Sequence, residues 1–177
     1  MLNSEQLRNK ASKIKYFFTD VDGTLTDGCT YYSMSGEAMK SFSHIDGTGF
    51  FLLKQAGIIA GIITGEASEI VQRRAEKLNV NLCFIGIQNK YDFITKFALN
   101  QKIGLDEIAY LGDDLNDLQL VNHVGLSFAS NNSHQLVKDA VDISCSINGG
   151  SGSFREAVEI LLTLQDRGIY ETFSQIL

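Results

Sequence analysis

The sequence is poor in three features that point to particular classes of protein. It contains only three cysteines, far apart, so neither a disulfide framework nor a zinc site of paired cysteines is indicated. Basic residues are in the minority, with 15 Lys and Arg against 21 Asp and Glu, which gives no electrostatic reason to bind nucleic acid or an anionic membrane. The longest apolar stretch, residues 56–64, is about half of what a membrane-spanning helix needs.

What is present is the composition of an ordinary globular domain. Hydrophobic residues make up 44% of the 177 residues and charged residues 20%, which argues against a disordered chain. A chain of this length buries roughly 70% of its unfolded surface, so we expect one domain over residues 1–177. Residues 1–15 are polar and lack the apolar run of a signal peptide, so we expect a cytoplasmic protein.

Short apolar runs alternate with helical patterns along the chain. The runs are continuously apolar, which is typical of strands covered on both faces. This order predicts an α/β fold with a doubly wound, mostly parallel sheet. We expect strands at 16–19, 58–63, 82–85, 108–111, 124–128 and 141–143, and helices at 50–56, 67–78, 91–102, 115–121, 133–140 and 153–164.

Residues 24–43 interrupt this alternation. Two β-rich stretches flank the turn-forming residues 33–37, a pattern that predicts a β-hairpin flap inserted after the first strand. A hairpin of this kind offers more apolar surface than a monomer leaves in water, so we expect the protein to self-associate through it. The apolar side chains of the flap are Tyr31, Tyr32, Met34 and Phe42.

Carboxylates cluster directly after two of the predicted strands. Asp20 and Asp22 follow the first, and Asp113, Asp114 and Asp117 follow the fourth. An Asp-Gly turn explains Asp22 and a helix N-cap explains Asp114, but neither explains Asp20 or Asp113. Ligands of an open α/β sheet bind beyond the carboxyl ends of its strands, and carboxylates gathered there repel one another without a cation. Ligands that are all oxygen select Mg²⁺ over zinc, so the sequence predicts a magnesium site.

Two further positions suit a bound phosphate. Thr64 and Gly65 end the second strand, and we expect a helix to begin near Glu66, so that a hydroxyl and free N–H groups face the ligand. Lys90, next to Asn89, begins another predicted helix, where a cation opposes the helix dipole unless it faces a phosphate. For each position taken alone, an ordinary helix cap and an ordinary surface lysine remain the alternatives.

Taken together, these residues resemble the four motifs of the haloacid dehalogenase (HAD) superfamily, in the right order and on the right elements. The resemblance implies a phosphatase in which Asp20 is the nucleophile and forms an aspartyl-phosphate. It implies that Asp22 protonates the leaving oxygen and then activates water, and that Thr64 and Lys90 hold the phosphoryl oxygens. The four motifs are residues 20–24, Thr64, Lys90 and residues 112–117.

The same resemblance implies the metal ligands. Asp20, Asp113 and the main-chain carbonyl of Asp22 would bind Mg²⁺. Asp114 and Asp117 would orient the metal's water molecules and Lys90.

Cap domains of this superfamily are inserted after the first motif or between the second and third. Here residues 22–64 leave room for a flap and residues 64–90 for one helix and one strand, so the chain is expected to be capless. Over residues 14–165 it resembles the small phosphatases of 3-deoxy-D-manno-octulosonate 8-phosphate and their relatives acting on nine-carbon ketodeoxy sugar acids. The resemblance implies a homotetramer with a ring of flaps, in which neighbouring chains complete each active site and the C-terminal helix and tail, 149–177, fold over it.

Substrate-binding residues follow from the same resemblance. Glu66 stands where the eight-carbon enzymes usually carry arginine, and Ile45 where they usually carry a basic residue. Glu66 with Arg74 and Lys77 resembles the nine-carbon enzymes. The implied substrate contacts are Thr64, Gly65, Glu66, Asn89, Lys90, Asp46, Arg74, Lys77 and Arg155.

We therefore expect a Mg²⁺-dependent phosphomonoesterase acting on a phosphorylated 2-keto-3-deoxy sugar acid of the 3-deoxy-D-manno-octulosonate 8-phosphate type, in the synthesis of lipopolysaccharide or another surface glycan. The nine-carbon phosphate is the alternative substrate. An alternative of another class is a non-catalytic assembly module of the kind fused to sugar cytidylyltransferases, against which Asp20 and Asp22 argue. A phosphomutase is disfavoured because it needs a mobile cap.

Overall fold

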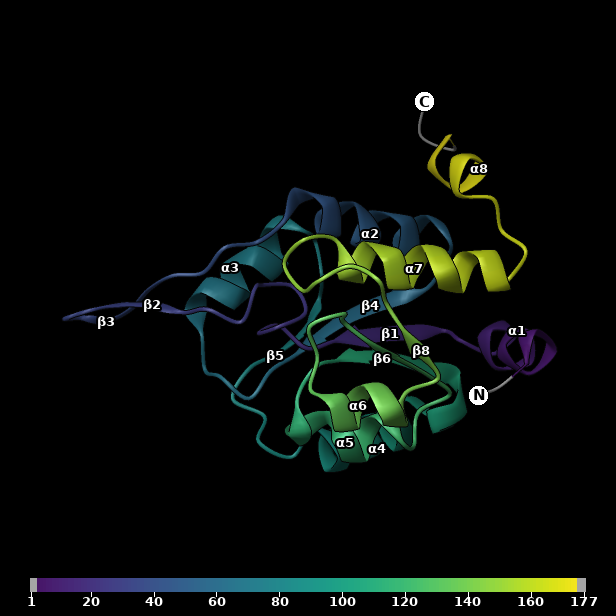
Figure 1. Cartoon of the computed structure of the whole chain (residues 1–177), viewed down its shortest axis with the longest axis horizontal. Helices are drawn as coiled ribbons and strands as arrows, with labels where there is room; N and C mark the ends of the chain where they lie inside the picture. Colours follow the sequence, from purple (N-terminus) through teal and green to yellow (C-terminus); the bar gives the residue numbers. More distant parts are fainter. Residues whose placement is uncertain (1–2, 175–177) are drawn as a thin grey trace.

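Six parallel strands form the central sheet of the protein (Figure 1). The computed structural model describes residues 3–174. The strand order β5-β4-β1-β6-β7-β8 places the first strand in the middle, which confirms the predicted doubly wound α/β fold. The bounds of the strands are Tyr16–Thr19 for β1, Ile59–Ile63 for β4, Leu82–Phe84 for β5, Ile108–Gly112 for β6, Leu126–Ala129 for β7 and Ile143–Ser144 for β8.

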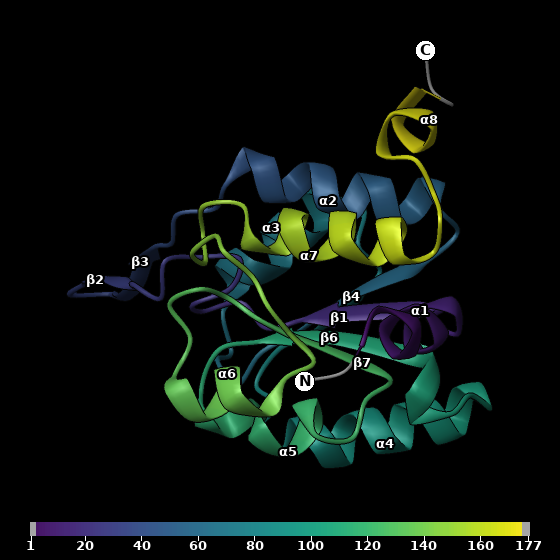
Figure 2. The same cartoon turned by 45° about the vertical axis from the view of Figure 1, so that its right-hand side comes forward.

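Helices cover both faces of the sheet, as Figures 1 and 2 show from two directions. One face is covered by α2 (His44–Gln55), α3 (Glu69–Lys77) and α7 (Ser153–Leu164), and the other by α4 (Lys90–Gln101), α5 (Leu118–Val121) and α6 (Gln135–Ala140). Successive residues of β1 therefore point into two different cores. Phe17 packs on Phe128 and Phe154 in the first core, and Phe18 packs on Phe84 and Phe97 in the second.

Several helix boundaries differ from the sequence prediction because capping side chains decide them. Helix α2 begins at His44 because the Ser43 side chain accepts the Ile45 N–H, well before the predicted start at residue 50. Helix α3 begins at Glu69, where Ser68 caps it, and not near Glu66. The prediction omitted α1 (Ser4–Ser12), which carries the capping box of Asn3 and Gln6, and α8 (Ile169–Ser174).

The flap is the antiparallel pair β2 (Tyr31–Ser33) and β3 (Gly36–Met39), which projects away from the sheet in Figure 1. Both strands are largely exposed, and the predicted hairpin is confirmed. Short 3₁₀ turns at Leu105–Glu107 and Leu115–Asp117 complete the described elements. None of the helices within residues 3–174 has the length and hydropathy needed to span a bilayer.

Candidate active site

The polar residues predicted at the strand ends meet at one edge of the sheet. Asp20, Thr64 and Asp113 directly follow β1, β4 and β6, three neighbouring strands. The chain winds outward from β1 to β4 and β5 and then returns to β6 on the other side, so the crevice lies where the winding reverses. A cavity of about 310 Å³ opens there, lined by Asp20, Asp22, Gly28, Thr64, Gly65, Glu66, Gln88, Asp113, Asp114 and Asn116.

The loop after β1 holds Asp20 firmly. The Asp20 N–H donates to the Leu111 carbonyl at 2.9 Å, and the Asp20 carbonyl accepts the hydroxyl protons of Thr19 and Thr24. Gly23 has a φ of +81°, and a Cβ at this position would lie 1.9 Å from Asp113 Oδ2. Only glycine therefore allows the loop to approach Asp113 this closely.

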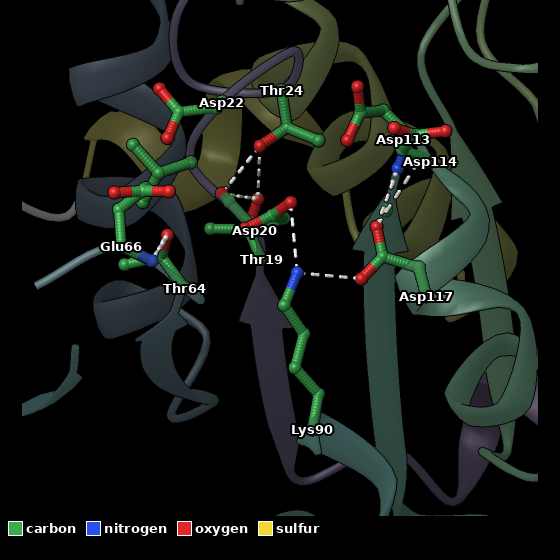
Figure 3. A network of polar contacts seen from close by, with 12 residues as sticks. Thr19, Asp20, Asp22, Thr24, Thr64, Glu66, Lys90, Asp113, Asp114 and Asp117 are labelled. Atoms are coloured by element: carbon green, nitrogen blue, oxygen red, sulfur yellow. Dashed lines mark hydrogen bonds and ion pairs between the residues drawn. The ribbon is translucent and has the colours of Figure 1, made fainter. Parts of the chain in front are cut away.

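Lys90 is buried beneath the cavity and points upward between two carboxylates (Figure 3). Its Nζ lies 2.9 Å from Asp20 Oδ2 and 2.7 Å from Asp117 Oδ1. Burial by itself lowers the pKa of Lys90, but the facing carboxylates of Asp20 and Asp117 outweigh it and raise the pKa above its usual value. Lys90 is therefore an ammonium at the centre of the site.

Asp117 receives donors from four directions. Oδ1 accepts from Lys90 and from the Tyr110 hydroxyl, both at 2.7 Å, and Oδ2 accepts the N–H groups of Asp113 and Asp114. Burial, reinforced by the charges of Asp117 and Asp20, raises the pKa of Tyr110 well above its usual value, so the phenol stays a donor. Sequence reasoning missed Tyr110, although a tyrosine in an otherwise aliphatic buried strand signals a hydroxyl in need of a partner.

Three of these carboxylates form a pocket fit for a small cation. One oxygen from each of Asp20, Asp113 and Asp117 lies within 4.8 Å of the others. Burial raises the pKa of Asp20 to about 7 and that of Asp113 to about 8, with the neighbouring carboxylates adding to the effect on both. Even with Lys90 beside them, burial and mutual repulsion disfavour the charged forms of Asp20 and Asp113, so a further cation would stabilise them, and an all-oxygen set of ligands suits Mg²⁺. The residues present therefore fit the predicted magnesium ion.

Asp22 lies on the opposite side of the cavity from Asp117 (Figure 3) and has a partner that the sequence did not suggest. Lys40, directly after β3, places its Nζ 2.5 Å from Asp22 Oδ1. The Lys40 side chain is 1% exposed, whereas that of Asp22 is 28% exposed and faces the cavity. No local pattern links these residues, because they meet only when the flap folds back on the loop after β1.

Thr64 lines the cavity, but not at a helix N-terminus as predicted. Its Oγ1 accepts the Glu66 N–H at 3.2 Å, and residues 65–68 form a loop before α3. Because Ser68 caps α3, the helix begins only at Glu69, and residues 65–68 lie outside it. Glu66 is exposed at the rim, and Gln88, which sequence reasoning missed, reaches across to donate to the Gly65 carbonyl at 2.8 Å.

Three of the predicted substrate contacts have partners within this chain. Asp46 is 2% exposed, and its Oδ1 accepts the Arg155 N–H at the start of α7, where Gly152 offers no capping side chain. The Arg155 side chain pairs with Glu159 along the same helix. Asn89 caps α4 by accepting the Asp92 N–H.

Arg74 and Lys77 also lie outside the cavity of their own chain. The Arg74 guanidinium donates to the Ser43 carbonyl at 2.9 Å and lies 5.5 Å from the centre of the Phe42 ring. Lys77 is exposed at the other end of α3, beside the amino ends of β4 and β5. The loop 149–152, expected to belong to a covering tail, packs within the chain, where the Gly150 N–H donates to the Thr24 carbonyl.

A capless α/β sheet with this arrangement of carboxylates and lysine defines a Mg²⁺-dependent phosphatase of the haloacid dehalogenase type. The family described as haloacid dehalogenase-like hydrolase matches residues 86–152. A relative from Haemophilus influenzae, named 3-deoxy-D-manno-octulosonate 8-phosphate phosphatase KdsC, is 36% identical over 94% of this chain and 93% of its own length. A relative of the same name from Escherichia coli K12 is 34% identical over 89% of this chain and 84% of its own length.

Solved structures agree. A 3-deoxy-D-manno-octulosonate 8-phosphate phosphatase from Moraxella catarrhalis, in complex with magnesium ion, phosphate ion and KDO, superposes with a TM-score of 0.92 at 34% identity, covering 99% of this chain and 100% of that one. A cobalt-bound deoxy-D-mannose-octulosonate 8-phosphate phosphatase from H. influenzae superposes with a TM-score of 0.85 at 38% identity, covering 89% of this chain and 92% of that one. The chain belongs to the 3-deoxy-D-manno-octulosonate 8-phosphate phosphatase family of haloacid dehalogenase-like hydrolases.

Proposed function

We propose that this chain hydrolyses 3-deoxy-D-manno-octulosonate 8-phosphate to the free sugar acid and inorganic phosphate. The observation that carries the proposal is the position of Asp20, a buried carboxylate at the cavity floor with Lys90 2.9 Å behind it and Asp22 across the opening. The relatives named for this substrate support it. Asp20, Asp22, Thr64 and Lys90 are its proposed catalytic residues.

In the first step the Asp20 carboxylate attacks the phosphorus, and the bond between phosphorus and the sugar oxygen breaks. Asp22 donates its proton to that oxygen, so that the sugar leaves as an alcohol. Lys90 and the Thr64 hydroxyl face the phosphoryl oxygens and balance their charge, as the loose transition state of phosphoryl transfer requires.

In the second step water attacks the phosphorus of the aspartyl-phosphate. Asp22, now a carboxylate, accepts the proton of the water, and the bond between phosphorus and Asp20 breaks. Asp20 returns as a carboxylate and Asp22 as an acid, so one turnover consumes one water molecule.

A bound Mg²⁺ supplies positive charge that lets an anionic nucleophile meet an anionic phosphate. Asp20, Asp113 and the main-chain carbonyl of Asp22 are its proposed ligands, and the Asp113 carboxylate is aimed at Gly23, the residue after Asp22. Asp117 orients Lys90, and Asp114, which is exposed at the cavity rim, would face the water molecules of a bound metal.

The relatives favour the eight-carbon substrate over the nine-carbon one. Because Glu66 lies at the cavity rim, the nine-carbon phosphate is the substrate against which the eight-carbon phosphate should be compared. The non-catalytic module and the phosphomutase are not favoured, because Asp20 and Asp22 share one cavity and the fold has no cap.

We also propose that the single domain assembles into a tetramer through the flap. The flap exposes 71% of Tyr32 and leaves Met34 fully exposed, and Tyr31 and Met39 extend the same apolar surface. Without a cap, a neighbouring flap or tail is what would exclude water from the cavity. In such an assembly, Arg74, Lys77 and Arg155 of one chain could serve the cavity of another.

The test is a phosphate-release screen of the purified protein. Eight-carbon and nine-carbon 2-keto-3-deoxy sugar-acid phosphates are compared with glucose 6-phosphate, with Mg²⁺ and with EDTA. We expect the highest kcat/KM on the eight-carbon ester, and activity only with Mg²⁺. Equal kcat/KM on glucose 6-phosphate would contradict the proposed substrate, and undiminished activity in EDTA would contradict the mechanism.

A further inference from the structure

The contact between Lys40 and Asp22 joins the flap to the cavity. A buried ammonium is costly unless partners compensate it, and Lys40 has three. Its Nζ lies 2.5 Å from Asp22 Oδ1, 2.7 Å from Thr30 Oγ1 and 3.6 Å from Glu37 Oε1. The side chain is therefore held in one place rather than free to sample the solvent.

The two oxygens of the Asp22 carboxyl group have different surroundings. Oδ1 faces the Lys40 ammonium, and the Thr26 hydroxyl lies 3.3 Å from the same oxygen. Among residues 3–174, no hydrogen bond is found to Oδ2. Because an ammonium only donates, Oδ1 is held as the acceptor of Lys40, and Oδ2 is the oxygen left to exchange a proton with a ligand in the cavity.

The Lys40 position is itself fixed by the base of the flap. Thr30 directly precedes β2 and Lys40 directly follows β3, so their contact closes the hairpin at its root. Glu37, within β3, also accepts the Ser68 hydroxyl at 2.5 Å, which ties the flap to the cap of α3. Asp22 is thus oriented by an element outside the four motifs.

We propose that Lys40 is a positioning residue that fixes Asp22 by Oδ1, so that Oδ2 is the oxygen that gives the proton to the leaving group and later takes one from water. This inference rests on the proposed function of Asp22 as acid and base. The Lys40 side chain is buried and is not among the residues that line the cavity. Without it the carboxyl group rotates, and its proton no longer faces the breaking bond between phosphorus and oxygen.

The chemistry provides a test that separates positioning from general structural support. Leaving groups of high basicity need a proton as the bond between phosphorus and oxygen breaks, whereas p-nitrophenolate leaves without one. Loss of a well-placed acid therefore slows phenyl phosphate more than p-nitrophenyl phosphate. The quantity to compare is kcat/KM, because it reports the steps up to cleavage of the ester and excludes the later hydrolysis of the aspartyl-phosphate.

The experiment measures kcat/KM of Lys40→Met on a series of substituted phenyl phosphates with Mg²⁺. General acid catalysis contributes about a hundred- to ten-thousandfold, and we expect the loss of positioning to cost about ten- to a hundredfold on phenyl phosphate and at most about threefold on p-nitrophenyl phosphate. Lys40→Arg, which keeps a cationic donor, should restore most of the wild-type dependence on the leaving group. Lys10→Met, which removes a different paired lysine far from the cavity, is the matched control and should leave both esters unchanged.

An equal loss on all esters, or no loss on any, would overturn the positioning role. If Lys40→Met fails to fold, by circular dichroism and elution volume, Lys40→Leu takes its place, because it also lacks a donor for Asp22 Oδ1. Failure of the proposed function is distinguishable, because it would appear in the wild-type protein as an absence of sugar-acid phosphatase activity.

Discussion

Lys90 Nζ lies 2.9 Å from Asp20 Oδ2, and both side chains are buried. The pairing places a buried ammonium directly behind the proposed nucleophile. It also explains how a lysine can begin helix α4 against the helix dipole, since two carboxylates outweigh the dipole's effect of some tenths of a kcal/mol.

Asp20→Asn should abolish turnover while the protein stays folded. The amide keeps the size of the side chain but cannot form an acyl phosphate. The measurement is phosphate release beside circular dichroism. Asp139→Asn, an exposed carboxylate on α6, is the control and should retain full activity. Substantial turnover by purified Asp20→Asn protein would exclude the aspartyl-phosphate mechanism.

Lys90→Met should destabilise the protein by about 3–5 kcal/mol, because removing one partner of a buried ion pair leaves its carboxylates uncompensated.

Tyr110→Phe should cost about 1–3 kcal/mol, because Asp117 loses a buried donor. Urea denaturation followed by fluorescence measures both. Tyr91→Phe, which removes a phenol hydroxyl away from Asp117, should change the free energy of unfolding by less than about 0.5 kcal/mol. A cost of Tyr110→Phe no larger than that would show that its contact with Asp117 contributes nothing.

The metal-free protein should lose stability as the pH rises through 7 and 8. Folding raises the pKa of Asp20 from 3.8 to about 7 and that of Asp113 from 3.8 to about 8, so the folded state holds protons that the unfolded state has released. Stability from these groups is therefore complete below about pH 4 and declines up to about pH 8.

Mg²⁺ should reverse this trend, because it binds the ionised carboxylates and its affinity rises over the same pH range. Thermal unfolding in EDTA and in Mg²⁺ from pH 6 to 8.5 makes the comparison, and Asp113→Asn should flatten the decline in EDTA. A melting temperature in EDTA that rises with pH across this window would contradict the buried state of these carboxylates.

Replacing Tyr32 and Met34 together by serine should dissociate the protein, because these are the most exposed apolar side chains of the flap. Light scattering coupled to size exclusion measures the mass at micromolar concentration. Leu99→Ser is the matched control, since Leu99 is 77% exposed on α4, away from the flap. A wild-type monomer at that concentration would contradict assembly through the flap.

Glu66→Arg should change the choice of sugar acid rather than the chemistry. Glu66 is an exposed anion at the cavity rim, where we expect it to accept hydrogen bonds from sugar hydroxyls. Loss of a charge-assisted hydrogen bond costs ~1.5–3 kcal/mol, which is about ten- to a hundredfold in kcat/KM. The ratio of eight- to nine-carbon phosphates turned over should shift, while p-nitrophenyl phosphate reacts much as before.

The control for this substitution is Glu69→Arg, which makes the same change in charge at the start of α3 but outside the cavity. It should leave the substrate ratio unaltered. An equal fall in activity on both sugar acids and on the generic ester would assign Glu66 a structural or general catalytic role.

The sequence by itself determined the fold class and the place of the site. Continuous apolar runs with polar residues directly after them define buried parallel strands, and the carboxyl ends of neighbouring strands share one edge. The sequence alone therefore predicts that Asp20, Thr64 and Asp113 meet.

Only the tertiary structure decided which side chains those residues touch. The Tyr110 side chain, on a buried face of β6, reaches Asp117 in the turn that follows the same strand. Lys40 reaches Asp22 because the flap folds back on the loop after β1. Asp46, by contrast, is held by the start of α7, 109 residues away in the chain. Local propensity depends on near neighbours, whereas contacts between distant segments depend on how the whole chain packs, so the partners of a buried charge become visible only in the folded molecule.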